Sequence, residues 1–258
     1  MSVLALALAL PAAASAGPSA RVAAVELSLQ AGGFYTGTAP LAEPASFQRG
    51  ASRDQLGRRT LRLRARGWAV RELQVALAWH GFPSGTVDGR FGPRLARALR
   101  RFQRSVGLRP DAIAGPATIA ALRSTPPRPA FPLAWPVLAP VGDPFGPRGN
   151  RFHTGIDLVA GTGAPVIAAA PGRVTWAGNR AGGWGNLVTI RHAGRVRTMY
   201  AHLSTVDVRV GDWIAGGTLI GLVGATGDAT GTHLHFEVRV GGAAIDPLRA
   251  LVVLSPGA

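Results

Sequence analysis

The 258-residue sequence has no cysteine and no lysine, and its acidic residues are few, 13 against 28 basic ones. Without cysteine there can be no disulfide, no thiolate nucleophile and no thiolate metal ligand, so a metal site would have to use histidine and carboxylate side chains. Charged residues make up 16% of the chain and apolar residues 47%. This composition excludes a chain that is disordered throughout and predicts one or two domains with a sizeable core.

The positive charge is unevenly distributed. All the basic residues are arginine, and residues 1–134 hold 18 of them with 6 acidic residues, a balance of +12. Residues 135–258 hold 10 arginines and 7 acidic residues, a balance of only +3. A basic N-terminal half could bind nucleic acid, anionic lipid or an anionic wall polymer, and composition alone does not choose among them.

The chain begins with an apolar run, MSVLALALALPAAASA, which ends in the small-x-small pattern Ala14-Ser15-Ala16. This pattern predicts a signal peptide over residues 1–16, although no basic residue precedes the run, and a helix of Ala and Leu is the alternative. Val3 to Ala14 are 12 residues, fewer than the roughly 20 that a membrane span needs. We therefore expect a secreted protein with no integral membrane segment after cleavage and no nucleic-acid partner.

An internal repeat lies within residues 88–122. Asp88–Pro93, read DGRFGP, recurs twenty-three residues later as Asp111–Pro116, read DAIAGP. Each Gly-Pro pair predicts the start of a helix, because proline fits the first helical position. A stripe of apolar residues at helical spacing follows the first pair, and a similar stripe precedes the repeat. The stripes, which predict a compact three-helix unit, are Leu95, Ala98, Leu99 and Phe102, and Val70, Leu73 and Leu77.

Residues 67–123 resemble the peptidoglycan-binding domain 1 family. The motifs that match are Asp88–Pro93, Phe102-Gln103-Arg104 and Gly107-Leu108, and the departure is Asp111-Ala112, where the family usually has Asp-Gly. The resemblance implies a three-helix module whose partner is peptidoglycan, the polymer of the bacterial cell wall. The arginines of its second helix could contact that polymer or only form a solvated face.

Two further segments flank this module. The apolar pattern of residues 22–34 precedes that of residues 70–82 by 48 positions, but it lacks the Asp-Gly-x-Phe-Gly-Pro turn. We expect residues 17–66 to be a truncated, degenerate copy of the peptidoglycan-binding repeat. On the other side, five prolines fall within residues 124–136. They predict a semi-rigid linker over residues 124–134 and a domain boundary.

From Trp135 onward the helical periodicity disappears. Short β-branched runs alternate with glycine-containing turns, as at Val166-Ile167, Arg173–Trp176, Leu187–Ile190 and Leu234–Val240. Residues 135–258 are therefore predicted to form an all-β domain of ordinary size. The fold class we expect is a multidomain α+β chain, with a small three-helix module followed by an antiparallel β domain.

Five of the six histidines lie in this β domain, and the informative ones fall in three short motifs. In a strand, residues i and i+2 point to the same face, so an HxH pair projects into one site. Zinc hydrolases use three histidine or carboxylate ligands and leave a fourth position open for water. His153, Asp157 and one of His233 and His235 would complete such a set. A single histidine is more often structural, but the motifs together favour a site: His153–Asp157, Tyr200–Leu203 and His233–Glu237.

Residues 135–247 resemble the lysostaphin-type zinc metallopeptidases, whose members cut peptides of bacterial peptidoglycan. The resemblance implies one Zn²⁺ per chain, held by His153, Asp157 and His235, with His202 and His233 as the catalytic pair. Thr232 replaces a common proline. The motifs that match are Phe145-Gly146-x-Arg148, His153-x-Gly155-Ile156-Asp157, Gly163-x-Pro165-Val166, Gly185-Asn186-x-Val188, Tyr200-Ala201-His202-Leu203, Gly211-Asp212, Gly221-x-x-Gly224-x-Thr226-Gly227 and Gly231-x-His233-Leu234-His235-Phe236-Glu237.

The function we expect is that of a secreted, cell-wall-associated zinc metalloendopeptidase that hydrolyses peptide bonds of peptidoglycan and is held there by its N-terminal module. The alternative is a non-hydrolytic wall-binding protein or an activator of cell-wall amidases, since some relatives have lost ligands; this chain retains all five residues. Other polar and aromatic residues have two interpretations each. Glu237 either orients a ligand or faces solvent, Trp184 and Tyr200 either border the groove or pack, and His80 and His192 are expected to be structural or on the surface.

Overall fold

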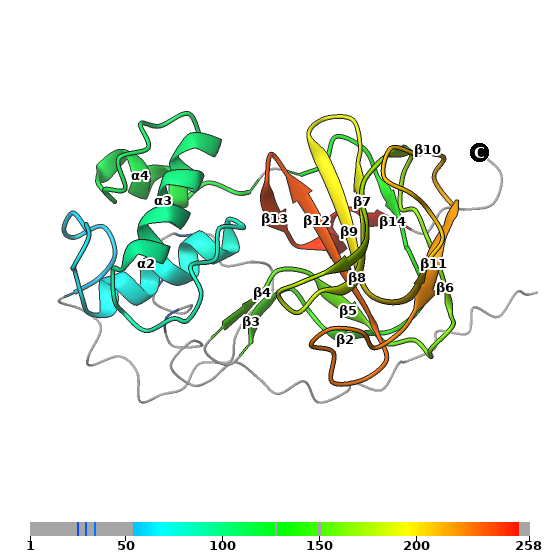
Figure 1. Cartoon of the computed structure of the whole chain (residues 1–258). Coiled ribbons are helices and arrows are strands. Elements are labelled where there is room, and N and C mark those ends of the chain that lie inside the picture. Colours follow the sequence, from blue (N-terminus) through cyan, green and yellow to red (C-terminus); the bar gives the residue numbers. More distant parts are fainter. Residues whose placement is uncertain are drawn as a thin grey trace, which may run out of the picture.

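The computed structural model describes Val25, Leu29, Phe34 and residues 54–126, 128–148 and 151–252 (Figure 1). The expected signal peptide, residues 1–16, lies outside the described residues, and so does most of the degenerate repeat, residues 17–66. Over the part of the chain that is described, no helix is both long enough and apolar enough to cross a membrane.

The N-terminal module contains the helices that the repeat predicts, α2 (Trp68–Trp79), α3 (Pro93–Ser105) and α4 (Pro116–Leu122). Helices α3 and α4 each begin at proline after an extended glycine, as the Gly-Pro pairs indicate. The apolar stripe of α3 is buried against α2, since Leu95, Leu99 and Phe102 are each at most 1% exposed. The predicted helical unit is therefore confirmed.

The two copies of the repeat have the same hydrogen-bonded turn. In the first, Gln74 Nε2 donates to Asp88 Oδ1 and Gly89 N donates to Gln74 Oε1, both over 2.9 Å. In the second, Gln103 bonds in the same way to Asp111 Oδ1 over 2.8 Å and to Ala112 N over 3.0 Å. Gly89 has a φ of 74° and Ala112 a φ of 61°, so the departure from Asp-Gly places a side chain in a left-handed backbone.

Replacing Ala112 by glycine should therefore stabilise the module. The left-handed conformation costs an L-residue about 1–2 kcal/mol, part of which is offset by the larger unfolded-state entropy of glycine, so we expect a gain of about 0.5–1 kcal/mol in the free energy of unfolding. Chemical denaturation measures this gain. The matched control is Ala120→Gly, in the exposed part of α4, which should lower stability by about 0.5–1 kcal/mol. A loss of stability in Ala112→Gly would show that the left-handed backbone at Ala112 is not strained.

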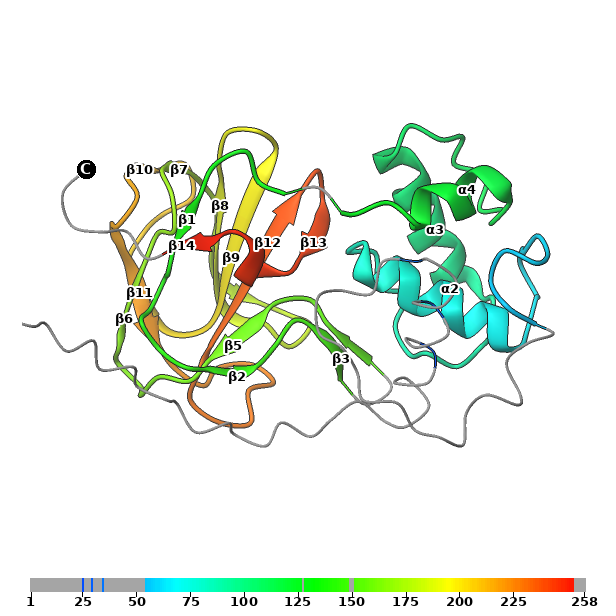
Figure 2. The same cartoon turned by 180° about the vertical axis from the view of Figure 1, so that it is seen from behind.

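The C-terminal domain is built on a 10-stranded sheet in which β10-β7-β8-β9-β12-β5-β2 is the main path (Figure 2). Its neighbours all pair antiparallel, whereas β1 and β14 form a separate parallel pair. The strands are β1 (Leu133–Ala134), β2 (Val141–Asp143), β3 (Gly146–Arg148), β4 (Arg151–His153), β5 (Ile156–Leu158), β6 (Pro165–Ile167), β7 (Gly172–Arg180), β8 (Gly185–Arg191), β9 (Val196–Val206), β10 (Trp213–Ile214), β11 (Leu219–Val223), β12 (Leu234–Val240), β13 (Ala243–Ile245) and β14 (Leu251–Val252), with a 3-10 helix η1 (Pro247–Arg249).

The two faces of the central strands β8, β9 and β12 differ. One face carries apolar side chains of the main core, among them Tyr200 and Phe236, both 0% exposed. The other, which we call the site face, carries His235, Glu237 and Arg239 of β12, because alternate residues of a strand point the same way. The all-β prediction is confirmed, and the strand β1 begins two residues before the expected boundary at Trp135.

The helical module packs directly against the β domain, beside β13 and the β3–β4 hairpin (Figures 1 and 2). The Trp79 ring at the end of α2 lies 5.7 Å from the Phe145 ring and 5.2 Å from the Phe152 ring, measured between centroids. The backbone N–H of Ala244 also donates to the carbonyl of Gly81 over 3.4 Å. These contacts tie the end of α2 to the hairpin that carries His153 and to β13.

Candidate active site

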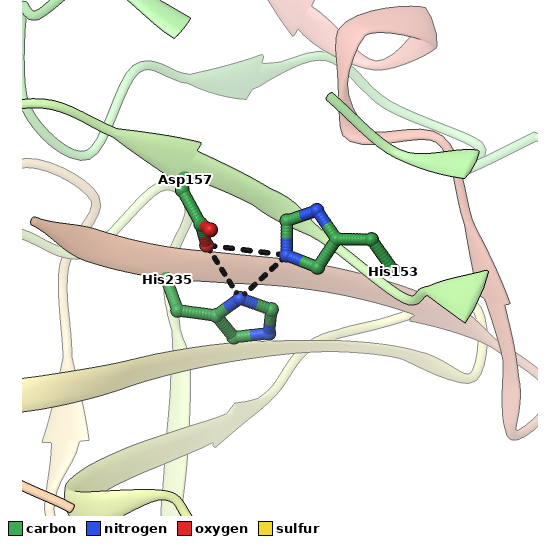
Figure 3. Close-up of side chains that lie close together, drawn as sticks. All are labelled: His153, Asp157 and His235. Atoms are coloured by element: carbon green, nitrogen blue, oxygen red, sulfur yellow. Dashed lines mark hydrogen bonds and ion pairs between the residues drawn. The ribbon is translucent and has the colours of Figure 1, made fainter. Parts of the chain in front are cut away.

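Three strands bring one imidazole, one carboxylate and a second imidazole together (Figure 3). His153 ends β4, Asp157 lies on β5, and His235 lies directly opposite Asp157 on β12. His235 Nδ1 is 3.0 Å from His153 Nε2 and 2.8 Å from Asp157 Oδ1, and His153 Nε2 is 3.1 Å from the same oxygen. The HxxxD and HxH motifs therefore converge on one point.

The hydrogen bonds of the other two ring nitrogens fix which nitrogen of each imidazole faces the centre of the cluster. His153 Nδ1 lies 2.9 Å from the carbonyl of Pro144, to which its N–H donates. His235 Nε2 lies 3.4 Å from Glu237 Oε1 and donates toward it. Two imidazole lone pairs and a carboxylate oxygen then converge, an arrangement that needs a cation between them. Three donors at about 2.0–2.1 Å from a tetrahedral zinc ion would lie about 3.3 Å apart, so this set fits such an ion with little movement.

The hydrogen bonds within the cluster shift the pKa of its carboxylate and of one imidazole in opposite directions. Burial raises the pKa of Asp157, but hydrogen bonds from His153 and His235 outweigh it and hold the pKa far below the ordinary range. Burial lowers the pKa of His235, but its bonds to Asp157 and Glu237 and the two carboxylate charges raise it to about 9. The site therefore favours a positive charge between the carboxylate and the two rings.

Glu237 is 0% exposed, so of its two interpretations the solvent-facing one is wrong. Its Oε1 accepts a hydrogen bond from the hydroxyl of Thr154 and faces His235, while its Oε2 is 2.7 Å from the guanidinium of Arg239. Burial raises the pKa of Glu237, but the bond to His235 and the charge of Arg239 bring it down to about 2. Glu237 thus stays ionised and orients the His235 ring.

The loop that follows His153 passes so close to β12, beside the His235 ring, that position 155 must be glycine. A Cβ at this position would lie 2.4 Å from the carbonyl oxygen of Phe236 and 3.0 Å from Cε1 of His235. The His-x-Gly-Ile-Asp motif therefore has a steric reason: a larger residue would push the loop of His153 away from β12.

His202 and His233 lie side by side next to the cluster, with ring centroids 4.8 Å apart. In each ring Nδ1–H donates to a backbone carbonyl, of Thr226 over 2.7 Å and of Gly231 over 2.9 Å, which leaves Nε2 with its lone pair. Burial lowers the pKa of His202. His202 also has a φ of 65°, an uncommon conformation for a residue with a side chain and one found repeatedly at functional sites.

These residues share one open groove of about 570 Å³. Trp184 borders it and packs edge-on to His235 with ring centroids 5.6 Å apart. Tyr200 is fully buried on the opposite face, where its hydroxyl accepts hydrogen bonds from Ala169 N and the Thr198 hydroxyl. The structure brings all the predicted site residues together in this groove: His153, Asp157, His202, His233 and His235.

Arg148 stands in the Phe-Gly-x-Arg motif, but the sequence alone assigns it no role. Its Nη2 lies 2.6 Å from Asp157 Oδ2 and 2.5 Å from Asp143 Oδ2. The guanidinium therefore holds the carboxylate oxygen that faces away from the two imidazoles, and so orients Asp157.

His80 and His192 lie away from the groove and are buried, 4% and 6% exposed. His80 Nε2 is 2.9 Å from the carbonyl of Leu122, and His192 Nδ1 is 2.9 Å from that of Pro171. Both are structural histidines, within the interpretation that the sequence gave them.

These two histidines should make the fold sensitive to acid. Burial lowers the pKa of both below the ordinary value of 6.5, so the folded state prefers them neutral. Their stabilisation is therefore complete above pH 6.5 and is lost as the pH falls below it, where the unfolded chain binds more protons. We expect the Tm to fall as the pH is lowered below about 6.5, and to fall less in His192→Gln. An equal fall in both proteins would contradict the role of His192.

Comparisons with known proteins agree with this geometry. Residues 151–247 match the model of peptidase family M23, and residues 66–122 match that of a peptidoglycan binding domain. The catalytic domain of lysostaphin from Staphylococcus simulans is 34% identical, with 43% of this chain and 90% of that chain covered and a TM-score of 0.41. The chain belongs to peptidase family M23. Within this family it has a metallopeptidase domain with an intact His-Asp-His cluster, preceded by a peptidoglycan-binding module.

Two relatives carry different names. The DD-carboxypeptidase/endopeptidase Mpg of Neisseria meningitidis is 47% identical over 114 residues, which cover 42% of this chain and 26% of that protein. The murein hydrolase activator NlpD of Escherichia coli is 40% identical over 119 residues, which cover 45% of this chain and 30% of that protein. The chain thus spans about a quarter of the Neisseria protein, and the matches are confined to one part of these M23 relatives.

Proposed function

We propose that the chain is a zinc metalloendopeptidase that hydrolyses peptide bonds of bacterial peptidoglycan while its helical module binds the same polymer. The observation that carries the proposal is the convergence of two imidazole lone pairs and a carboxylate oxygen, with two further imidazoles beside them, in one open groove. The 47% identity to a protein named as a DD-carboxypeptidase/endopeptidase supports the substrate class.

His153 Nε2, Asp157 Oδ1 and His235 Nδ1 would hold one zinc ion. When bound there, zinc supplies a Lewis acid that polarises a carbonyl and lowers the pKa of water toward neutrality. The chain supplies the rest of the geometry: the Pro144 carbonyl and Glu237 fix the two rings, and Arg148 fixes the carboxylate.

His202 and His233 would move the proton of the attacking water. Each has Nε2 free to accept it, because Nδ1–H is held by a backbone carbonyl. Once protonated, the same nitrogen can donate to the leaving amine, which completes general base and general acid catalysis. Burial lowers the pKa of His202, which keeps its ring neutral near pH 7 before the reaction starts.

We further propose where the protein acts, which is outside the cell at the cell wall. The apolar start of the sequence is consistent with export, and the partner is then the cell wall rather than nucleic acid. The domain limits also remain predictions: a signal peptide over 1–16, a degenerate repeat over 17–66, the binding module over 67–123, a linker over 124–134 and the peptidase over 135–258.

The test is hydrolysis of purified wall. Residues 17–258 would be loaded with zinc, incubated with peptidoglycan from several bacteria, and the released fragments analysed by mass spectrometry. We expect new amino and carboxyl termini that disappear with a chelator and return when zinc is restored. If folded, zinc-loaded protein binds every wall tested and releases no fragment, the peptidase proposal fails and an activating or purely binding function replaces it.

A further inference from the structure

Four arginines stand in one row across the sheet. Arg173 on β7 is the Cα partner of Arg191 on β8, Arg191 is the partner of Arg197 on β9, and Arg197 is the partner of Arg239 on β12. Side chains of directly opposed residues in antiparallel strands lie close together on the same face. We call these residues the arginine row.

The row lies on the site face. Arg239 follows Glu237 by two positions and His235 by four on the same strand, so the three side chains point to one side. Four residues of a strand span about 13 Å, which places Arg239, the member of the row on β12, about that far from His235. An extended peptide of a few residues can therefore reach from the groove to the row.

The row also borders a hollow of its own. Arg191, Arg197 and Arg239 line a cavity of about 330 Å³ together with Arg195 of the β8–β9 turn and the glycines of the β12–β13 turn. A sixth arginine approaches from the helical module, since burial and the charge of Arg239 lower the pKa of Arg101 on α3. The end of this positive surface at Arg195 and the β12–β13 turn therefore lies beside the helical module.

Acidic residues balance little of this charge. Among the described residues, the row has a single ion pair, in which Nη2 of Arg239 lies 2.7 Å from Glu237 Oε2. Arg173, Arg191 and Arg197 are exposed and have no carboxylate within 4.0 Å in the part of the chain that the structure describes. Like charges that are directly opposed destabilise a sheet, so a bound anion would relieve a repulsion that the fold maintains.

We propose that the arginine row binds carboxylate groups of the peptidoglycan peptides whose neighbouring bond lies in the groove. A planar guanidinium can hold a carboxylate through two parallel hydrogen bonds, and arginine keeps its charge at any physiological pH. The row and the metal ligands lie on the same face of the sheet. The carboxylate that binds the row therefore belongs to the substrate in the groove rather than to a separate molecule. This inference rests on the proposed function, because it assumes the same polymer.

The variant that tests it is the triple substitution Arg173→Gln, Arg191→Gln and Arg197→Gln, which keeps the Arg239–Glu237 pair beside His235. The matched control is Arg58→Gln, Arg62→Gln and Arg64→Gln, which removes the same charge from three exposed arginines that precede the binding module and lie far from the row in sequence. Unfolding temperatures of both variants establish that they fold.

Binding is measured by pelleting the zinc-loaded protein with purified peptidoglycan within minutes at low temperature and about 0.15 M salt, where weak long-range attraction is screened. Released fragments are quantified in the same supernatant, so binding and hydrolysis are read separately. Three wall preparations are compared: untreated, treated with hydrofluoric acid to remove phosphodiester-linked polymers, and amidated at its carboxyl groups.

The unsubstituted chain should bind the untreated and acid-treated walls alike and the amidated wall about tenfold more weakly, as expected for three exposed ion pairs. The row variant should bind all three walls equally and weakly, while the control variant keeps the preference. An equal loss in both variants would mean attraction by net charge alone, and a loss with acid treatment would assign a phosphate ligand; either overturns the proposal. The binding preferences of the two variants can be read even if no fragment is released. The absence of released fragments would contradict the peptidase function and would leave the test of the arginine row intact.

Discussion

Replacing Asp157 by asparagine should abolish zinc binding and hydrolysis together. The amide keeps the shape of the side chain but removes the charge that lies 2.8 Å from His235 Nδ1 and 3.1 Å from His153 Nε2. Loss of an outer partner of a metal ligand already costs 10–100-fold in affinity, so loss of a ligand's charge should cost more than about 100-fold. Competition titration with a chromophoric chelator measures the zinc affinity.

Asp143→Asn is the matched control for this substitution. Its carboxylate contacts the same guanidinium of Arg148, over 2.5 Å, but is not part of the His-Asp-His cluster. We expect the control to bind zinc stoichiometrically and to retain most of its activity. Stoichiometric zinc in Asp157→Asn with unchanged affinity would remove this residue from the ligand set.

Replacing His233 by glutamine should separate catalysis from metal binding. Its Nδ1–H is held by the Gly231 carbonyl, and its Nε2 lies 3.7 Å from Asp157 Oδ1 but is not one of the three clustered ligand atoms, so zinc should remain bound. Loss of a positioned acid or base lowers turnover about 10²–10⁴-fold. The expected result is therefore full zinc content with fragment release reduced by at least about 100-fold, measured by mass spectrometry of digested wall.

His202→Gln should behave in the same way, because its ring has the corresponding contacts with the Thr226 carbonyl. His192→Gln controls for the loss of an imidazole elsewhere in the β domain and should leave the rate per folded molecule unchanged. If His233→Gln released fragments at the rate of the unsubstituted chain, the assignment of the proton-transfer pair would be wrong.

The sequence predicts these site residues because their motifs depend on local geometry. The two-residue period of a strand places His233 and His235 on one side, and Gly-Pro pairs begin α3 and α4 where the repeat indicates. Neither signal depends on distant parts of the chain: both histidines line the groove, and both helices begin at the proline.

Other features depend on contacts between distant segments and were not visible in the sequence. Glu237 could be judged buried only once the loop of Thr154 was known to cover β12. The carbonyls of Pro144 and Thr226 orient their imidazoles through loop conformation, which leaves no residue-specific signal. The order of the strands and the parallel β1–β14 pair likewise follow from long-range pairing rather than from the pattern within each strand.

The position of Trp79 changes how the helical module contributes to activity. Its ring packs on Phe145, which follows the carbonyl that holds His153, and on Phe152, which precedes His153 itself. A module on a flexible tether raises only the local concentration of its partner domain. Under the proposed function, a module fixed by this contact would also set the direction from which the polymer reaches the groove, so the bound wall strand and the bond to be cut would keep a constant separation and orientation.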